Sequence, residues 1–227
     1  MSGGGGIRKL FGKMGGNVEV TKMSPDFVKS CEHVDQYKEA VDQLADRFEG
    51  AIQQNPAVLQ TGSIECQPGE NPHEKTAASL GIFMTYFGGD KANQVKELIE
   101  ENKKLAAVER SSQVTARRAI RHMRRFYITE YKAIKDERDK LDKAREHMDT
   151  MKHEVKQAKT TEQIEKKAVL YEEAVGAFDA QAAKVIEIIG TLPALQKTHV
   201  NDVHEYFENL SQFHGKMAHS IAKREIA

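Results

Sequence analysis

Residues 90–159 read DKANQVKELIEENKKLAAVERSSQVTARRAIRHMRRFYITEYKAIKDERDKLDKAREHMDTMKHEVKQAK, and this stretch decides the fold. Every seventh position across eight heptads belongs to one mostly apolar column: Ile99, Ala106, Gln113, Ile120, Tyr127, Ile134, Leu141, Met148 and Val155. Such a column is typical of a coiled-coil seam, and its strict period predicts a left-handed supercoil with partner helices. Because no proline or glycine interrupts the stretch, it can form a helix about 100 Å long at about 1.5 Å per residue.

A second column, in register with the first, is basic and contains no acidic residue. It consists of Arg110, Arg117, Arg124, Tyr131, Arg138, Arg145, Lys152 and Lys159. We therefore expect an apolar stripe and a basic stripe to run side by side along one rod. The alternative for any single arginine is an ion pair with a glutamate of a neighbouring helix.

Composition favours long helices over an α/β enzyme, since 30% of the 227 residues are charged, none is Trp and 5 are Pro. The 34 basic and 34 acidic residues balance, so an anionic partner has to be held by local clustering, and nucleic acid is not an expected partner. Arg110 to Arg125 is such a cluster, with six arginines and no acid. Two distant cysteines and the lack of a signal peptide or a membrane-spanning apolar run predict a cytoplasmic protein.

Residues 1–23 are expected to be a glycine-rich amphipathic leader that stays disordered until it binds a membrane. Four apolar residues recur there with the spacing of one helix face: Ile7, Leu10, Phe11 and Met14. A short segment rich in glycine is unstable as a helix in water, whereas a membrane surface would bury these side chains. We expect the four residues to insert into a membrane. A frayed leader without that role is the alternative.

The remainder, residues 24–227, is expected to form three helices. Ser24 and Pro25 provide an N-cap and a first-turn proline, so helix 1 is expected at about 24–55. It is expected to end near Asn55-Pro56, because the residue before a proline disfavours the helical conformation.

Residues 61–71 are polar and are expected to form a loop. Asn71-Pro72-His73-Glu74 then reads as an N-cap, a first-position proline and a capping-box glutamate, which start helix 2 at about 72–159. Gly88-Gly89 predicts a kink or a brief interruption of this helix at 88–89.

Helix 3 is expected at about 161–225, after a T-x-x-Q box at Thr160 to Gln163 turns the chain back. Its seven-residue column is Ile164, Tyr171, Phe178, Val185, Leu192, His199, Tyr206 and Phe213. Pro193 lies inside this pattern and predicts a bend near 193 rather than a break. The expected fold class is all-α, a long kinked antiparallel three-helix coiled coil.

So thin a bundle has a large surface for its volume and needs a partner. Apolar side chains are expected to gather at the end opposite Lys159, where two copies would meet in a crescent-shaped homodimer. The expected interface residues are Phe27, Val34, Val41, Leu80, Phe83, Met84, Phe87 and Phe213.

Several short motifs occur together along the chain. They are Gly15-Gly16 before Thr21-Lys22 and Asp26-Phe27, then Asn55-Pro56-Ala57, Arg124-Arg125 with Tyr131-Lys132, and Leu192-Pro193-Ala194-Leu195 followed by Tyr206 and Phe213. Combined with three helices, a basic tip and an amphipathic leader, they resemble a BAR (Bin/amphiphysin/Rvs) domain over nearly the whole chain, most like the endophilin branch. The loop at 61–71 is shorter and less apolar than the membrane-inserting appendage of endophilins, so that device is not expected. A domain for proline-rich ligands is not expected after Ala227, and neither are the partners of such a domain.

The resemblance implies a homodimer, peripheral on anionic phospholipid membranes, that senses or generates curvature in endocytosis or vesicle trafficking. The candidate lipid-binding residues of the concave face are Arg117, Arg118, Arg121, Arg124, Arg125, Lys132 and Lys135. Those of the tip are Lys152, Lys156, Lys159, Lys166 and Lys167. We expect the tip lysines to be the more available, because a turn has no neighbouring helix to pair with them.

The alternative function is a cytosolic coiled-coil scaffold that binds a protein such as a small GTPase. Catalysis, a cofactor and a metal site are not expected. His204-Glu205 lacks the second histidine of a zinc motif, and His214 and His219 do not share a helix face.

Overall fold

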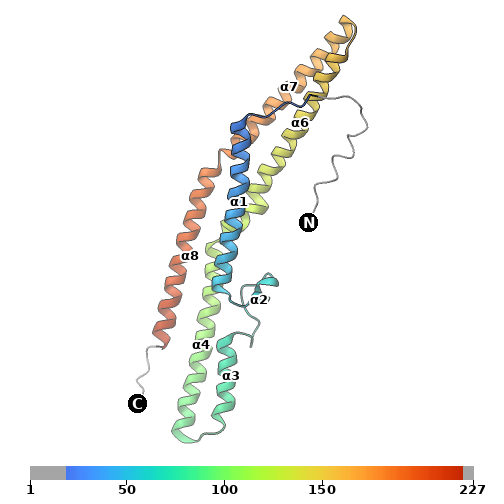
Figure 1. Cartoon of the computed structure of the whole chain (residues 1–227). Coiled ribbons are helices and arrows are strands. Elements are labelled where there is room, and N and C mark those ends of the chain that lie inside the picture. The colour runs from blue at the N-terminus through green and yellow to red at the C-terminus, as the bar shows by residue number, and fades with distance from the viewer. Residues whose placement is uncertain (1–18, 222–227) are drawn as a thin grey trace. The chain divides into compact units, whose positions relative to one another are not determined.

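The computed structural model describes residues 19–221, and over these residues the chain is made of helices joined by turns, with no strand (Figure 1). The expected all-α class is confirmed. The described residues divide into two compact units. We call residues 34–131 with 192–221 the core unit, and residues 19–33 with 132–191 the tip unit.

Three long helical segments make up most of the core unit. They are α1 (Pro25–Ile52) from residue 34 onward, α4 (Gly89–Ala119) continued by α5 (Arg121–Phe126), and α8 (Leu192–Ile221). In Figure 1, α4 and α8 lie side by side. Aromatic residues fill part of the interior: the ring centroids of Phe48 and Tyr206 are 4.1 Å apart, and the Tyr206 hydroxyl donates to the Phe48 carbonyl at 3.2 Å.

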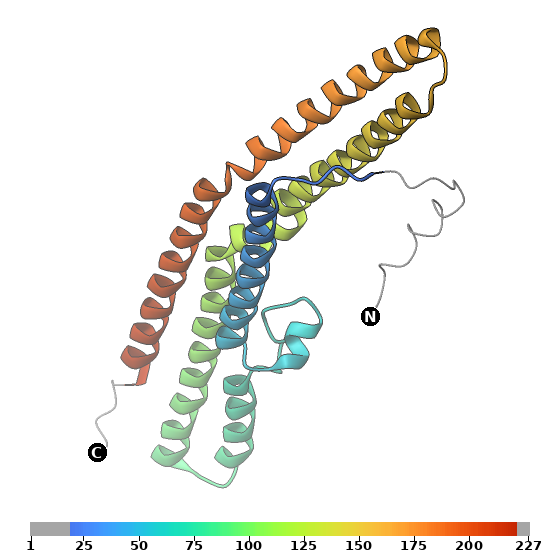
Figure 2. The ribbon, with the colours of Figure 1, turned by 45° about the horizontal axis from the view of Figure 1, so that its top comes forward.

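The chain reverses where a kink in helix 2 was expected. Helix α3 (Pro72–Met84) packs against α4 instead of continuing into it, as Figures 1 and 2 show. The start of α3 lies far along α4, since the Asn71 side-chain amide donates to Glu109 at 2.8 Å. Gly89 adopts φ +58°, which glycine accepts without strain, so the Gly88-Gly89 pair permits a tight return. The long central helix therefore begins at Gly89 and not at residue 72.

The expected loop between the first two helices is held by buried polar contacts. A short helix, α2 (Pro56–Gln60), precedes it and begins after the N-cap Asn55. The Gln53 side chain donates to the Ile64 carbonyl at 2.9 Å, and the Arg110 guanidinium donates to the Cys66 carbonyl. Asn71 forms the expected capping box with Glu74 at the start of α3.

The central helix is irregular in two places that the seven-residue period did not predict. Ile120 leaves the helical conformation at φ −93°, ψ 23°, between α4 and α5. A π-helical turn, η1 (Tyr127–Tyr131), follows α5. Tyr127, an expected seam residue, is 52% exposed, whereas its neighbour Phe126 is fully buried. The column residues on either side, Ile120 and Ile134, are both buried and 14 positions apart, so the seven-residue period resumes after the π turn and only the position between them shifts, from Tyr127 to Phe126.

The tip unit is an antiparallel pair of helices, α6 (Lys132–Gln157) and α7 (Thr161–Ile189), visible at the upper right of Figure 2. Thr160 caps α7 by accepting a hydrogen bond from the Gln163 amide, as the T-x-x-Q box predicted. The buried residues of the pair include Ile134, Leu141 and Met148 from α6 and Ala174 and Val185 from α7.

The third predicted helix is interrupted and not merely bent. Helix α7 ends at Ile189 and α8 begins at Leu192, with Gly190 and Thr191 between them. Pro193 has no N–H with which to continue the helical ladder, and this accounts for a break just before it. Residues of the predicted apolar column are buried on both sides of the break, as Val185, Leu192 and Tyr206 show.

Candidate functional site

Two arginines of the predicted concave face are held by acidic residues of α1. Arg124 contacts Asp46 Oδ1 and Glu49 Oε2, each at 2.6 Å. Arg117 Nε lies 3.1 Å from Glu49 Oε1, and its Nη1 donates to the Gly62 carbonyl at 2.8 Å. Because Glu49 is buried and needs this positive charge, Arg117 and Arg124 are structural residues. Both side chains also remain partly exposed, at 38% and 30%, so their assignment to a lipid-binding face stays a prediction.

The rest of that predicted face is exposed. Arg121 lies 3.7 Å from Glu205 of α8, a distance typical of a loose surface pair. Among the described residues, no ion pair involves Arg118, Arg125, Lys132 or Lys135, and all four are exposed. Arg118 and Arg125 belong to the core unit, and Lys132 and Lys135 to the tip unit.

The five tip lysines differ in their surroundings. Lys159 and Lys166, at and after the α6–α7 turn, are exposed and form no ion pair within residues 19–221. Lys167 Nζ lies 3.6 Å from Glu154 Oε2. The two remaining lysines, Lys152 and Lys156, face an acid from outside the helix pair.

That acid belongs to an extended segment, residues 19–24, which we call the strap. Figure 2 shows it passing beside α6 before α1 begins. Glu19 Oε2 lies 2.9 Å from Lys156 Nζ and 3.9 Å from Lys152 Nζ. The hydrogen bond from Lys156, together with the charges of Lys156 and Lys152, lowers the pKa of the Glu19 carboxyl below its ordinary value. The expectation that tip lysines lack acidic neighbours thus fails for these two, as it does for Lys167.

Thr21 fastens the strap to α6. Its amide donates to Asp149 Oδ2 at 2.9 Å, and its hydroxyl donates to Asp149 Oδ1 at 2.5 Å. Asp149 is only 4% exposed, so its carboxylate depends on these two donors. The heptad pattern gave no sign of this contact, because Asp149 directly follows the seam residue Met148 and looks like a solvated flank.

The four predicted insertion residues, Ile7, Leu10, Phe11 and Met14, lie outside the described residues.

The end of α3 carries an exposed apolar cluster. Ile82 is 69% exposed, Phe83 52%, Tyr86 80% and Phe87 36%, and the Phe83 and Phe87 rings are 4.7 Å apart. Large apolar side chains grouped in this way on a surface indicate an interaction site. We call these residues the α3 cluster.

The other predicted interface residues divide into two groups. Val34 and Val41 are at most 4% exposed in the single chain, so they are core residues and their assignment to a dimer interface is wrong. Three others, Phe27, Leu80 and Met84, are half-buried.

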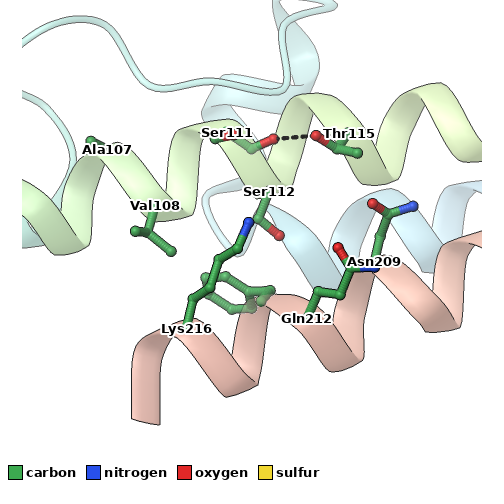
Figure 3. A pocket seen from close by; sticks show the side chains of 9 residues that line it. Ala107, Val108, Ser111, Ser112, Thr115, Asn209, Gln212 and Lys216 are labelled. Carbon is green, nitrogen blue, oxygen red and sulfur yellow. Dashed lines mark hydrogen bonds between the residues drawn. The ribbon is translucent and has the colours of Figure 1, made fainter. Parts of the chain in front are cut away.

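Phe213, the last predicted interface residue, lies in a groove of about 280 Å³ between α4 and α8. Figure 3 shows Ser111, Ser112 and Thr115 of α4 on one wall and Asn209, Gln212 and Lys216 of α8 on the other. The groove and the α3 cluster both belong to the core unit.

A buried polar network at the Ile120 break was missed by the sequence analysis. Asp202 of α8 accepts hydrogen bonds from the amides of His122 and Met123, at 2.9 and 3.1 Å. Its other carboxylate oxygen lies 2.7 Å from His122 Nδ1. Asp202 therefore caps α5 from a neighbouring helix, which compensates for the lack of a side-chain cap at Ile120.

His199, one turn earlier on α8, shares a hydrogen bond of 2.7 Å with the Tyr37 hydroxyl. Burial lowers the pKa of His199, although the nearby charges of Asp202 and Glu130 act in the opposite direction. A signal for this network was present, since His199 is a polar residue within an otherwise apolar column.

No group of three or more potential metal ligands occurs among residues 19–221, and no helix in that range is long and apolar enough to cross a membrane. Comparison with protein families gives one informative result: the family model described as the BAR domain matches residues 7–226, nearly the whole chain. A search among curated proteins found no significant match.

Proposed function

The chain belongs to the BAR domain family, and we propose that it binds anionic membranes as a homodimer and senses or generates their curvature there. BAR domains dimerise, bind lipid membranes peripherally and sense or generate membrane curvature. The finer points proposed here are the preference for anionic lipid, the residues that recognise it and a cytoplasmic role in endocytosis or vesicle trafficking.

The observation that carries the proposal is that Lys159 and Lys166, at the α6–α7 turn, are exposed and form no ion pair within residues 19–221. A basic residue near an anionic leaflet contributes about 1 kcal/mol of binding. Two such residues give weak binding in one chain, but a dimer doubles the number of contacts on the same surface. The exposed Arg118, Arg125 and Lys132 are further candidates, in support of the turn.

The proposed dimer uses the α3 cluster of the core unit. Four large side chains there are exposed in the single chain, and a twofold partner presenting the same cluster would bury them. Burying an apolar side chain fully is worth about 1.5–3 kcal/mol. Phe213 and the α4–α8 groove are the second part of the proposed interface.

The leader adds shallow insertion in this proposal. Ile7, Leu10, Phe11 and Met14 have the spacing of one helix face, and they would fold only where a lipid surface buries them.

The test is vesicle co-sedimentation of a Lys159→Glu, Lys166→Glu variant. Equal mixtures of phosphatidylserine and phosphatidylcholine form the anionic vesicles, and pure phosphatidylcholine forms the neutral ones. We expect the wild type to bind only the anionic vesicles, with an affinity that falls as salt rises. The variant should lose about tenfold or more in affinity at low salt, since two charges change sign.

The matched control is Lys91→Glu with Lys197→Glu, which makes the same change of charge at exposed positions of the core unit. This control variant should bind the anionic vesicles more tightly than the Lys159→Glu, Lys166→Glu variant does. Equal binding of the wild type to neutral and anionic vesicles would contradict the electrostatic proposal. If the wild type binds neither the anionic nor the neutral vesicles, the alternative function, a scaffold that binds a protein, would be favoured.

A further inference from the structure

Lys152 and Lys156 are one helical turn apart on α6, and a single carboxylate lies between them. Glu19 Oε2 is within 2.9 Å of the Lys156 ammonium and within 3.9 Å of the Lys152 ammonium. Two ammonium groups that converge on one oxygen form a site for an anion, and here the anion is supplied by the chain itself. Any other group that binds these lysines has to compete with Glu19.

The anchor at Thr21 explains why Glu19 occupies this position. Thr21 makes two hydrogen bonds to the buried Asp149 carboxylate, one turn before Lys152. The anchor is two residues from Glu19, so it confines the Glu19 carboxylate to this part of α6. Without it, Glu19 would be one exposed acid on an extended segment.

The two contacts of the strap differ in how easily they exchange. Asp149 is 4% exposed, whereas the Glu19 side chain is 70% exposed and Lys156 56%. Solvent and salt reach the Glu19 pair freely, so another anion can replace this carboxylate at little cost. The exposed contact therefore exchanges first, and the buried contact, which sets its position, opens only once Glu19 has left α6.

From this arrangement we infer that Lys152 and Lys156 form an anion site which Glu19 occupies in the free protein, and that the phosphate of an anionic lipid headgroup displaces Glu19 on a membrane. The inference rests on the proposed function, and it assigns a regulatory role to a segment outside the helices. The strap weakens binding to sparse charge and yields to a surface that presents many phosphates.

Displacement also changes the reach of the chain before Glu19. The strap is six residues long, and an extended chain spans about 3.3–3.6 Å per residue, so its release frees about 20 Å. Recognition of headgroups by the two lysines would thereby give the leader a longer tether. The two parts of the proposed membrane contact are linked through the strap.

The experiment compares three variants in binding to vesicles of equal parts phosphatidylserine and phosphatidylcholine. Thr21→Val removes the hydroxyl donor without changing the charge, and Glu19→Gln removes the competing carboxylate. We expect each to bind about threefold to tenfold more tightly than the wild type, because one or two lysines become available. Glu146→Gln is the control, because it removes one negative charge from an exposed position of α6 where no ion pair is formed. It should bind less tightly than Glu19→Gln.

The second readout is hydrogen exchange of the Thr21 amide, which follows the strap directly. The amide should be protected in the free wild type, unprotected in the wild type on anionic vesicles, and less protected in Thr21→Val. Inorganic phosphate without vesicles separates a soluble anion from a lipid headgroup. Loss of protection with vesicles only supports the headgroup, and equal loss with inorganic phosphate would overturn the membrane assignment.

The outcomes separate this inference from the function on which it rests. If the wild type and both strap variants bind vesicles equally, or if Glu146→Gln matches Glu19→Gln, the strap inference is wrong and the membrane proposal stands. If none of them binds, the proposed function fails and the inference fails with it. If the wild type binds and both strap variants bind more tightly, both are supported.

Discussion

Arginines of the core unit and lysines of the tip unit belong to the same basic column of the sequence, yet they have different surroundings. Arg117 and Arg124 meet the buried Glu49 through short contacts. At the α6–α7 turn, Lys159 has no ion pair among the described residues, and Lys152, one heptad earlier, meets only an exposed acid, Glu19. A guanidinium is suited to fixed, partly buried pairing, whereas an ammonium is a hydrated point charge that exchanges partners easily.

This difference teaches that charge in a column does not by itself indicate a binding face. What decides is the group opposite each residue. In the core unit, α1 supplies acids that turn arginines into structural contacts. In the tip unit, Lys159 and Lys166 form no ion pair within residues 19–221, and Lys152 and Lys156 meet only the acid of the strap. Changes in the core unit should therefore affect stability, and changes in the tip unit should affect binding.

The largest expected effect comes from Asp202→Ala in the core unit. The substitution removes the acceptor for two backbone amides and leaves His122 without its partner. Loss of a charged, buried acceptor should lower the free energy of unfolding by about 3 kcal/mol or more. Urea denaturation followed by circular dichroism measures it. Asp202→Asn, which keeps one oxygen acceptor, should cost less, and an unchanged midpoint for Asp202→Ala would remove the structural role assigned to this network.

A medium effect is expected from Arg124→Ala, compared with Arg118→Ala six residues earlier. Arg124 contacts two acids, so its removal should cost about 1–2 kcal/mol of stability. Arg118 is exposed and outside any ion pair within residues 19–221, so its removal should cost less than about 0.5 kcal/mol. Denaturant unfolding of the two variants is the measurement. Equal losses of unfolding free energy in the two variants would show that the ion pairs of Arg124 do not contribute to stability.

The smallest effect concerns pH and His199. Burial lowers the pKa of His199 below its ordinary value of 6.5, so the unfolded chain binds the proton more readily than the folded one. The stability due to neutral His199 is therefore complete above about pH 6.5 and is lost as the pH falls toward the lower native pKa. Tyr37, His122, Glu130 and Asp202 are the other titratable groups near it.

Unfolding free energies measured at several pH values test this prediction. His199→Gln should give a flatter dependence than the wild type below neutral pH. His204→Gln, at an exposed position of the same helix, is the matched control for the loss of one imidazole. A wild-type curve as flat as that of His199→Gln would be inconsistent with the direction of the pKa shift.

Periodicity predicted the helical parts of the fold well, because buried apolar residues recur at intervals of seven along these helices. Ile134, Leu141 and Met148 are buried as their column requires, and Asn71 caps α3 as its motif requires. The failures are at single positions where backbone geometry overrides periodicity. Gly88-Gly89 allows a reversal as readily as a kink, and Pro193 terminates the helical ladder where the pattern of side chains continues.

The candidate site was less predictable, since its decisive contacts join residues far apart in the sequence. Glu19 and Lys156, or Thr21 and Asp149, share no spacing that could be recognised before folding. The acids that pair with Arg124 could not be predicted either, since they lie on another helix. Exposure of Lys159 and Lys166 was foreseeable, because they flank a turn.

The π turn at Tyr127–Tyr131 has a consequence for comparing this chain with its relatives. Counting in sevens reaches the buried Gln113 and Ile120 before the turn and the buried Ile134 and Leu141 after it, so the turn leaves the period intact. Only the position between them departs, because Phe126 is buried where the column has Tyr127. A relative with a straight helix here would therefore align without a gap, but its residue opposite Tyr127 would face inward and the one opposite Phe126 would face outward.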